Sequence, residues 1–402
     1  MADPVRLSPP SPASPPSPPS PAPPLAPLPP APPASPLAPL SPALSAPTGP
    51  GPDLPGIRGA VDRVLDDFLA GKARSAERDG MPPEVIAVLR DFVLRGGKRL
   101  RPLLSACGWY AAGGSGDPAA VVRLGAALEL FHAFALIHDD LMDGSATRRG
   151  RPTVHRALAE LHGRTRTPEA AERVGAGSAI LIGDLAFGWS CELLHAAEPS
   201  GPRADALLRV VHAMRTEVMF GQYLDLVATG GPTDDLDVPL KIIRYKTATY
   251  TCERPLHAGA VLAGAGRPLL DACTAFALPL GEAFQLRDDL LGVFGDPDAT
   301  GKSSLDDLRE GKHTVLLALA LRRSAPGHRA ELRHLVGDPE LDEEGAARVR
   351  ALLVAAGARA GVEKMIRTRR AQALSALRSA GFPPAVTECL RALTDSLTDR
   401  TG

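Results

Sequence analysis

The longest apolar pattern in the chain lies between Pro118 and Asp143 and predicts a helix at the centre of the fold. The segment is rich in Ala and Leu, contains no internal proline and ends in acidic residues. A helix of about 26 residues is about 39 Å long at 1.5 Å per residue. Because apolar residues cover most of its sides, we expect neighbouring helices to surround it.

Helical periodicity recurs along most of the remaining chain, whereas the alternation typical of strands is nearly absent. We expect further helices over residues 56–69, 83–94, 177–197, 204–226, 239–265, 269–294, 314–323, 344–356 and 362–380. The predicted fold class is therefore all-α, with one large helical bundle as a single domain.

Composition changes this picture at the N-terminus. Of the 41 prolines, 23 fall within residues 1–55. Proline removes backbone donors, and the segment has few residues that could form a core. We therefore predict a disordered or polyproline II extension over residues 1–55, followed by an all-helical domain over residues 56–402. The functional alternative for the extension is a docking tail for a proline-binding partner.

Charge and cysteine content exclude several function classes. Lys plus Arg total 45 and Asp plus Glu total 46, so no basic excess favours nucleic acid as a partner. No run of 18 apolar residues occurs, so we predict no transmembrane segment. The five cysteines lie far apart and form no CxxC pair. A disulfide framework is not expected, and a cytoplasmic location fits this usage.

The first candidate for chemistry is the group Asp139, Asp140 and Asp143 at the end of the central helix. Asp139 and Asp143 are four residues apart and share one helix face. Carboxylates so close repel unless a cation lies between them, and hard oxygen ligands suit Mg²⁺. The alternative, a solvated acidic helix end, fits poorly because the preceding residues are almost wholly apolar.

A second acidic pair, Asp288 and Asp289, also follows a helical apolar run, with Gln285 one turn upstream. The pair alone is a weak indication of metal binding, and its value comes from the first motif. Basic residues gather near both motifs: Lys98, Arg99 and Arg101; Arg148, Arg149 and Arg151; Lys246; Lys302 and Lys312. Any one of these clusters is explained as well by a solvated face. Together they indicate two bound diphosphates, one held through Mg²⁺ and one held directly.

The order of the motifs carries a family resemblance. The segments GGKRLRP, ELFHAFALIHDDLMD, RRGRPTVH, GD, GQ, KT and FQLRDDLLGVFGD, then GK, occur in this order over residues 56–395. The chain resembles the trans-isoprenyl diphosphate synthases, also called polyprenyl synthetases. The resemblance implies the type I isoprenoid synthase fold, a helical bundle around a central cavity, and a homodimer.

The resemblance also implies a reaction. Isopentenyl diphosphate is condensed head to tail with an allylic diphosphate (dimethylallyl, geranyl or farnesyl) in the presence of Mg²⁺. The allylic diphosphate ionises to a carbocation, the double bond of isopentenyl diphosphate attacks it, and a proton departs to the released diphosphate. Because charge separation is the barrier, catalysis rests on stabilising the leaving diphosphate.

Site residues follow from the same resemblance. The resemblance implies that Asp139, Asp143 and Asp288 bind about three Mg²⁺ ions. It leaves open whether Asp140 and Asp289 also bind them. The other implied roles are allylic diphosphate binding by Arg148, Lys246 and Lys302; isopentenyl diphosphate binding by Lys98, Arg101, His132 and Arg149; substrate binding by Lys312; and cation stabilisation by Thr247 and Gln285. His132 is seven residues before Asp139, about 20° away around a helix, and so faces the same way. A satisfied buried histidine is the alternative there.

One departure from the family pattern concerns the second motif. A glycine, Gly292, holds the fifth position, where an aspartate is usual. Asp296, four residues later, is one candidate substitute, although a turn-capping role suits it better.

The residues before the first motif are implied to set product length. A small Ala135 and a bulky Phe134 resemble geranylgeranyl diphosphate synthases, whose product has 20 carbons. On the helical wheel, Ala135 lies within about 40° of Asp139 and Phe134 about 140° away, so Phe131 is another candidate for the floor of the pocket. Products of 15 or 25 carbons are the alternatives.

Two other functions compete with this one. A class I terpene cyclase also uses an aspartate-rich helix, but it needs no second diphosphate site, and the Asn/Ser/Glu metal motif that it carries is not found. A non-catalytic subunit of a heteromeric synthase would be expected to lose aspartates, and both pairs are present.

Overall fold

The computed structural model describes residues 51–197, 201–296 and 304–399. By its internal contacts the chain divides into two units, Met1–Ser45 and Ala46–Gly402. The second unit contains all the described residues. Its first helix begins at Leu54, two residues before the predicted start of the helical domain. Most of the predicted proline-rich extension lies outside the described residues, as does Lys302.

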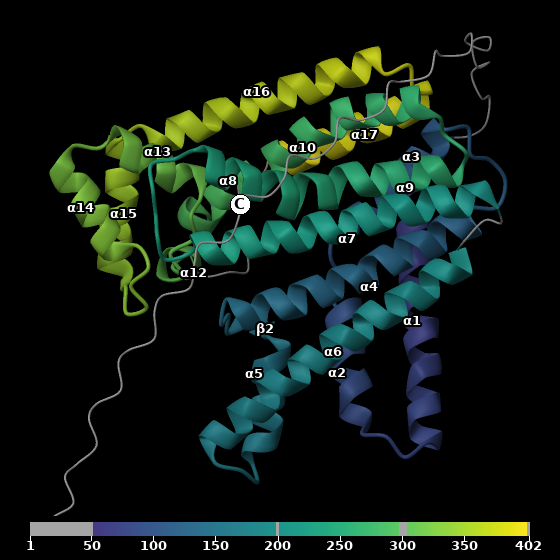
Figure 1. The fold of residues 1–402 in the computed structure, drawn as a ribbon, viewed down its shortest axis with the longest axis horizontal. Coiled ribbons are helices and arrows are strands. Elements are labelled where there is room, and N and C mark those ends of the chain that lie inside the picture. Colours follow the sequence, from purple (N-terminus) through teal and green to yellow (C-terminus); the bar gives the residue numbers. More distant parts are fainter. Residues whose placement is uncertain (1–50, 198–200, 297–303, 400–402) are drawn as a thin grey trace, which may run out of the picture. The chain divides into compact units, whose positions relative to one another are not determined.

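The described part of the chain is built from helices, as predicted (Figure 1). They are α1 (Leu54–Arg78), α2 (Pro83–Leu94), α3 (Leu100–Ala111), α4 (Ala119–Met142), α5 (Val154–Gly163), α6 (Pro168–Ala197), α7 (Pro202–Ala228), α8 (Asp237–Ile242), η1 (Ile243–Glu253), α9 (Arg254–Leu262), α10 (Arg267–Phe294), α12 (Asp306–Arg309), α13 (Val315–Arg323), α14 (Pro326–Leu335), α15 (Glu343–Ala355), α16 (Ala358–Ser379) and α17 (Pro384–Thr398). Two two-residue strands, β1 (Thr147–Arg148) and β2 (Arg151–Pro152), pair antiparallel in the basic segment after α4.

The single helix expected over residues 239–265 is divided into α8, η1 and α9. The middle part, η1, is a π-helix, which has wider turns than an α-helix and is frequent at functional sites. It contains three β-branched threonines, Thr247, Thr249 and Thr251, which lower helix propensity. Apolar periodicity does not distinguish a π-helix from an α-helix, so the sequence pattern predicted one continuous element.

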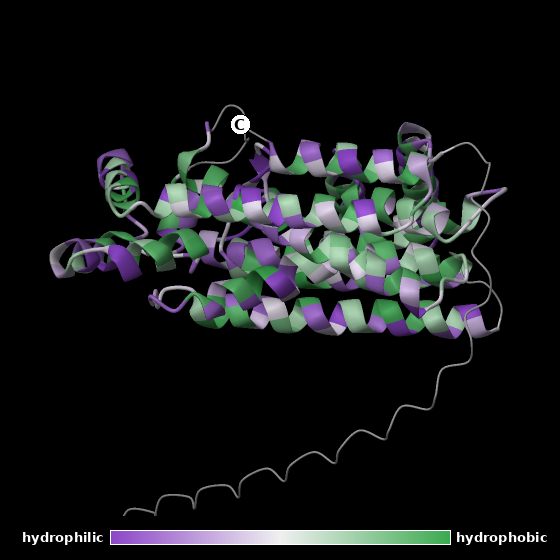
Figure 2. Cartoon of the chain, turned by 90° about the horizontal axis from the view of Figure 1, so that it is seen from above, coloured by the Kyte–Doolittle hydropathy of each residue, from purple (hydrophilic) through white to green (hydrophobic). Residues whose placement is uncertain are grey.

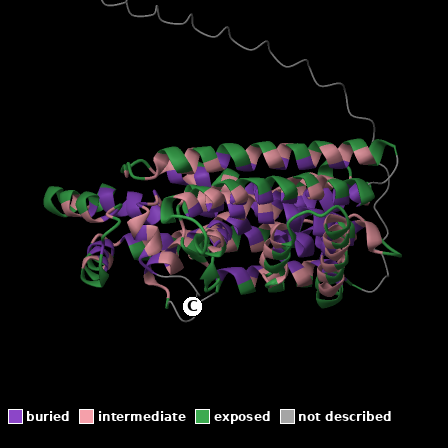
Figure 3. Cartoon of the chain, turned by 90° about the horizontal axis from the view of Figure 1, so that it is seen from below, coloured by how far each residue is buried: buried purple, intermediate pink, exposed green. Residues whose placement is uncertain are grey.

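Helix α4 lies at the centre of the bundle, as its apolar sides predicted. It packs against α1, α2, α3, α6 and α9. Leu124, Leu130 and Phe131 on this helix are all buried. Along the outer helices, hydrophobic and hydrophilic residues alternate around the axis (Figure 2), and exposed residues line their outward faces (Figure 3). The central position of α4 places its acidic C-terminal end among the neighbouring helices.

Among the described residues, α4 and α6 have the length and mean hydropathy of a membrane-spanning helix. In α4 the most apolar stretch is 67% buried inside the fold, as in the core helix of a globular domain. In α6 the corresponding stretch is only 33% buried. Helix α6 therefore exposes apolar side chains, among them Ile180 and Leu181.

Two glycines allow neighbouring helices to approach η1 closely. A Cβ atom on Gly221 of α7 would overlap the backbone nitrogen of Lys246, and one on Gly281 of α10 would lie 2.5 Å from the Cα atom of Ala248. Only a residue without a side chain permits such an approach. The two contacts bring α7 and α10 against η1, and this brings their polar residues within reach of Lys246 and Thr247.

Candidate active site

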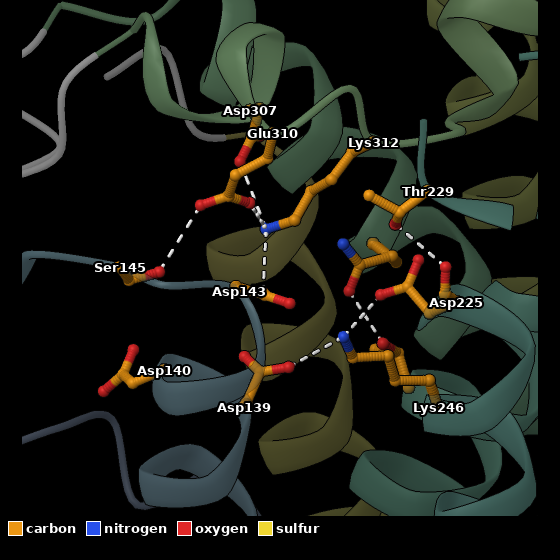
Figure 4. Close-up of polar contacts among 12 residues, drawn as sticks. Asp139, Asp140, Asp143, Ser145, Asp225, Thr229, Lys246, Asp307, Glu310 and Lys312 are labelled. Atoms are coloured by element: carbon orange, nitrogen blue, oxygen red, sulfur yellow. Dashed lines mark hydrogen bonds and ion pairs between the residues drawn. The ribbon is translucent and has the colours of Figure 1, made fainter. Parts of the chain in front are cut away.

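The end of α4 meets η1 and α7 through one lysine. The Nζ atom of Lys246 donates to Oδ1 of Asp139 at 2.9 Å and to Oδ2 of Asp225 at 2.6 Å (Figure 4). Burial opposes the charge on Asp139, but Lys246, Arg148 and Lys312 outweigh it and lower the pKa of its carboxyl. Burial likewise opposes the charge on Lys246, and the two aspartates raise its pKa. Asp139 and Lys246 are therefore both ionised at neutral pH.

A second lysine, Lys312, joins Asp143 of the first motif to carboxylates of and beside α12. The Nζ atom of Lys312 lies 3.7 Å from Oδ2 of Asp143, 3.4 Å from Oδ1 of Asp307 and 3.0 Å from Oε2 of Glu310 (Figure 4). These carboxylates overcome the cost of burial and hold the pKa of Lys312 well above its usual value. Burial and the charge of Asp139 raise the pKa of Asp143 to about 6.

The second motif faces the same region from α10. Thr247 donates to Oε1 of Gln285 at 2.7 Å, and Nε2 of Gln285 donates to Oδ1 of Asp289 at 2.8 Å. Burial, with the charges of Asp288 and neighbouring aspartates, raises the pKa of Asp289 to about 8. Asp288 is exposed and, three residues after Gln285 on α10, it shares the face that Gln285 turns to η1.

Asp140 pairs with an arginine instead of facing the lysines. Nε of Arg148 lies 2.7 Å from its Oδ1 and 2.8 Å from its Oδ2. Nη2 of Arg148 also reaches Oδ2 of Asp139 at 3.3 Å. Asp140 is only 1% exposed. Because both of its oxygens accept from Arg148, Asp140 positions this arginine beside Asp139.

A basic group gathers around Tyr250 of η1. The guanidinium of Arg101 stacks 4.1 Å from the centre of the Tyr250 ring, and its Nη2 donates to Oγ1 of Thr251 at 2.6 Å. Its Nε atom is buried without a hydrogen-bond partner. His132 shares its Nδ1 with the Tyr250 hydroxyl at 3.2 Å. Burial and the nearby arginines hold the pKa of His132 well below its usual value, so its imidazole is neutral.

The loop before α3 is held by Arg99. Arg99 donates to Oε2 of Glu129 and Oδ1 of Asp62, each at 2.8 Å, and to the carbonyl of Val93. It has a left-handed backbone conformation, with φ of 49°. Arg99 is buried, whereas its neighbour Lys98 is exposed. Arg99 therefore anchors the segment from within the fold and leaves Lys98 at the surface.

Arg149 connects this loop to the strand pair after α4. Its Nη1 donates to the carbonyl of Gly96 at 2.5 Å, and it too has a positive φ, of 54°. A Cβ atom on Gly97 would lie 3.2 Å from its Nη2, so the glycine permits the contact. The two basic segments that were separate in the sequence, residues 96–102 and 147–153, are thus in contact.

Three acidic residues of the site were not identified from the sequence: Asp225, Asp307 and Glu310. Asp225 lies four residues after Gly221 in the GQ segment, and that spacing is the one indication that the sequence offered. Asp307 and Glu310 lie in α12 and directly after it, and no periodic pattern marks them. Their contacts with Lys312 join them to the first motif.

The candidate chain-length residues belong to a cluster of rings. The ring of Phe134 lies 5.3 Å from those of Phe131 and Phe187 and 4.7 Å from that of His138. Phe131 is 1% exposed, while Phe134 and Ala135 are half-buried. Phe134 therefore lies at the accessible side of the cluster and Phe131 behind it.

The donor set suits a hard divalent cation. The carboxylates of Asp139, Asp143 and Asp225 face two ammonium groups, and carboxylate oxygens are the ligands that Mg²⁺ prefers. In the described part of the chain, no three acidic, histidine or cysteine side chains already form a closed metal-binding group. Lysine ammonium groups stand between the carboxylates instead and neutralise them. Mg²⁺ keeps several waters and shares its shell with phosphate, so it does not require a closed protein cage.

Comparisons with known proteins identify the family of this chain. Residues 82–354 match the sequence model of the family described as polyprenyl synthetase. The chain is 33% identical over 303 residues to a geranylfarnesyl diphosphate synthase of Aeropyrum pernix, covering 74% of this chain and 85% of that one. It is 31% identical over 307 residues to a (2E,6E)-farnesyl diphosphate synthase of Mycobacterium tuberculosis, covering 76% and 80%.

A solved structure extends the likeness to the fold. The geranylgeranyl pyrophosphate synthase of Corynebacterium glutamicum, complexed with isoprenyl diphosphate and magnesium, has a TM-score of 0.79 and 39% sequence identity. The match covers 85% of this chain and 98% of that one. The all-α fold predicted from the sequence is therefore the isoprenoid synthase fold. The chain belongs to the polyprenyl synthetase family.

Proposed function

We propose that the protein condenses isopentenyl diphosphate with an allylic diphosphate, in the presence of Mg²⁺, to give geranylgeranyl diphosphate. One observation carries this proposal: carboxylates from α4 and α7 converge on Lys246, while a separate basic group gathers around Arg101. The first arrangement suits a diphosphate bound through metal, and the second suits a diphosphate bound directly. The Corynebacterium relative, solved with magnesium and isoprenyl diphosphate, supports both substrate and metal.

The acidic side binds the allylic substrate in this proposal. Asp139, Asp143 and Asp288 would hold Mg²⁺, which when bound neutralises the charge that builds up on the leaving diphosphate. Lys246 and Arg148 already lie beside Asp139 and can turn their N–H donors to phosphate oxygens. These donors are strongest where negative charge develops, as the allylic C–O bond breaks.

The region between the two sides stabilises the carbocation. Thr247 and Gln285 are hydrogen bonded to each other, so the pair presents fixed oxygen dipoles from η1 and α10. Fixed dipoles need no reorganisation when the positive charge appears. The double bond of isopentenyl diphosphate then attacks the cation, and the proton lost from the adduct goes to the released diphosphate.

The basic side holds isopentenyl diphosphate without metal. The Nε–H of Arg101 is buried without a partner, and such a group gains most from an anion. Arg149 and Lys98 lie on the two contacting basic segments, and Lys98 is exposed for binding. His132, whose pKa is lowered by burial and by the arginines around it, is neutral and donates one hydrogen bond without adding charge.

The length of the product is the finer part of the proposal. The relatives compared above carry farnesyl, geranylgeranyl and geranylfarnesyl names, so membership of the family leaves length open. We propose the 20-carbon product because Ala135 leaves space near Asp139, while Phe134, packed against Phe187, blocks a longer chain. Removing the ring of Phe134 would be expected to lengthen the product.

Product analysis tests the function and the length together. Purified full-length protein is incubated with Mg²⁺, labelled isopentenyl diphosphate and dimethylallyl, geranyl or farnesyl diphosphate in turn. A linear 20-carbon diphosphate supports the whole proposal. A linear product of another length overturns only the assignment of length. A cyclic hydrocarbon, or no product with any primer, overturns the condensation itself.

We also propose that the protein is a homodimer. Apolar side chains lie exposed on α6 (Ile180, Leu181 and Leu185) and on α7 (Met219, Phe220, Tyr223, Leu226 and Val227). The two helices are in contact, because Arg215 of α7 lies 4.9 Å from the ring of Phe187 on α6. An apolar surface of this extent is typical of an interface between subunits. Phe220→Asp should yield a monomer by light scattering, whereas an unchanged mass would exclude this face as the interface.

The cellular location is likewise proposed. All five cysteines are free, and three of them, Cys107, Cys252 and Cys273, are buried. Thiols without disulfide partners suit a reducing compartment, so we propose a cytoplasmic protein. Imaging of a tagged full-length chain in its own cell tests this, and a signal confined outside the cytoplasm would contradict it.

A further inference from the structure

The second aspartate motif has a glycine, Gly292, at its fifth position. A side chain from another helix occupies the space beside this glycine. A Cβ atom built on Gly292 would overlap Oδ2 of Asp307 and would lie 3.0 Å from its Cγ. Asp307 belongs to α12, fifteen positions further along the chain. Its carboxylate therefore occupies the space that a side chain of residue 292 would enter.

The position of Gly292 defines the direction in which this carboxylate points. Residue 292 is four positions after Asp288 on α10, so the two share one helix face. A carboxylate over Gly292 is consequently beside Asp288 and along the same face as Gln285. This is where an aspartate in the fifth position of the motif would present its oxygens.

Contacts on its other side join Asp307 to the first motif. Oδ1 of Asp307 lies 3.4 Å from Nζ of Lys312, and the same ammonium lies 3.7 Å from Oδ2 of Asp143. One oxygen of Asp307 thus covers Gly292, while the other faces the lysine that also contacts Asp143. The side chain is 23% exposed, so it is open to a ligand.

We propose that Asp307 supplies the carboxylate that the second motif lost at Gly292, and that it binds the divalent cation together with Asp288. The inference rests on the proposed magnesium chemistry. It adds to that chemistry a ligand from α12 which enters the site from a separate element. Gly292 and Asp307 then act as one pair, because the carboxylate needs the empty space above the glycine.

Asp296 does not fill this role in the structure. Helix α10 ends at Phe294, and the following Gly295 has an extended backbone with ψ of 156°. The chain therefore leaves the helical path before it reaches Asp296, and helical spacing no longer places this residue over the face of Asp288. Asp296 is exposed. It provides a matched control, since it is an aspartate only four positions after Gly292.

Cation binding tests the proposal without relying on turnover. Full-length protein is titrated with Mn²⁺ in the presence of inorganic diphosphate, and bound Mn²⁺ is followed by electron paramagnetic resonance. Asp307→Asn keeps the shape of the side chain and should weaken Mn²⁺ binding by about ten- to a hundredfold. Asp296→Asn should bind as the parent protein does. Equal affinity of the parent and Asp307→Asn, or a loss confined to Asp296→Asn, would overturn the proposal.

An exchange of the two residues separates a ligand from a structural support. Gly292→Asp alone should impair Mn²⁺ binding, because the new side chain and that of Asp307 collide in one space and neither carboxylate can take the parent position. Gly292→Asp combined with Asp307→Gly should restore binding toward the parent value, since the carboxylate returns to the same place from α10. Failure of the double variant to exceed Asp307→Gly, with both folded by circular dichroism, contradicts the proposal. If the parent protein binds no Mn²⁺ with diphosphate, the proposed function itself fails.

Discussion

Lys246 donates a hydrogen bond of 2.9 Å to Asp139, so a residue of the π-helix η1 holds the acidic end of the central helix. The same ammonium lies 2.6 Å from Asp225 and neutralises the mutual repulsion of the two carboxylates. A divalent cation that binds with diphosphate can neutralise these carboxylates in place of Lys246, because the cation carries more positive charge than the ammonium group. Lys246 therefore helps to keep Asp139 ionised, so that its carboxylate is ready to bind metal.

Replacing Asp139 tests the acidic side of the site. Asp139→Ala should lower turnover by about two orders of magnitude or more, since several kcal/mol of charge stabilisation depends on metal at this position. Turnover of labelled isopentenyl diphosphate measures the effect, and circular dichroism checks the fold. Asp66→Ala, which removes an exposed carboxylate paired with Arg90, is the matched control and should be active. Near-normal turnover in Asp139→Ala refutes its metal role.

Product length should depend on Phe134. Phe134→Ala opens the accessible side of the ring cluster and should lengthen the product, as read by chromatography of the dephosphorylated chains. An unchanged 20-carbon product would move the floor of the pocket to Phe131. Phe131→Ala is expected to cost about 3–5 kcal/mol of stability as well, because this ring is fully buried.

The proline-rich extension should be dispensable for the reaction. Deleting residues 1–50 removes a segment with hardly any charged side chain that could bind phosphate, so turnover and substrate affinity should match those of the full chain. Steady-state kinetics of the two proteins side by side measure this. A large loss of activity in the shortened protein would give the extension a role in the enzyme.

His132 should make the protein less stable in acid. Burial and Arg99, Arg101, Arg148 and Arg149 lower its pKa in the folded state well below the value near 6.5 of an unfolded chain. Between those two values the unfolded state binds more protons, so the free energy of unfolding falls as pH decreases below about 6.5.

Urea denaturation between pH 5 and pH 7.5 checks this sign. The stability of the parent protein relative to His132→Gln should decrease as the pH is lowered, because the variant has no imidazole to protonate. A difference that stays constant, or that grows in the parent protein's favour in acid, contradicts the predicted direction.

The buried ion pair of Arg99 with Glu129 should matter for stability. Their atoms are 2.8 Å apart and both side chains are buried, so Arg99→Met leaves a carboxylate without its partner. The expected loss is about 3–5 kcal/mol in urea denaturation. The exposed pair of Arg90 with Asp66 is the matched control, and Arg90→Met should cost only about 0–1 kcal/mol. Equal losses in the two variants would show that burial does not decide the effect.

The sequence identified elements whose properties are local. The apolar run before Asp139 predicted α4, and the four-residue spacing to Asp143 placed both carboxylates on one face, because helical geometry depends only on neighbours along the chain. The basic segments and the second motif were recognised for the same reason. The helix that contains Lys246 was predicted as well, but its π-helical form was not. This π-helical segment is the part that α7 and α10 approach closely.

The tertiary structure decided which of these groups meet. Lys246 and Asp139 are 107 positions apart, and nothing between them in the chain predicts a hydrogen bond. Likewise Asp307 reaches the empty place above Gly292 only because α12 folds back onto α10. The sequence by itself determined the kinds of residue, their helix faces and the family. Partners across the site depend on packing between distant helices, and long-range packing is a property of the whole fold.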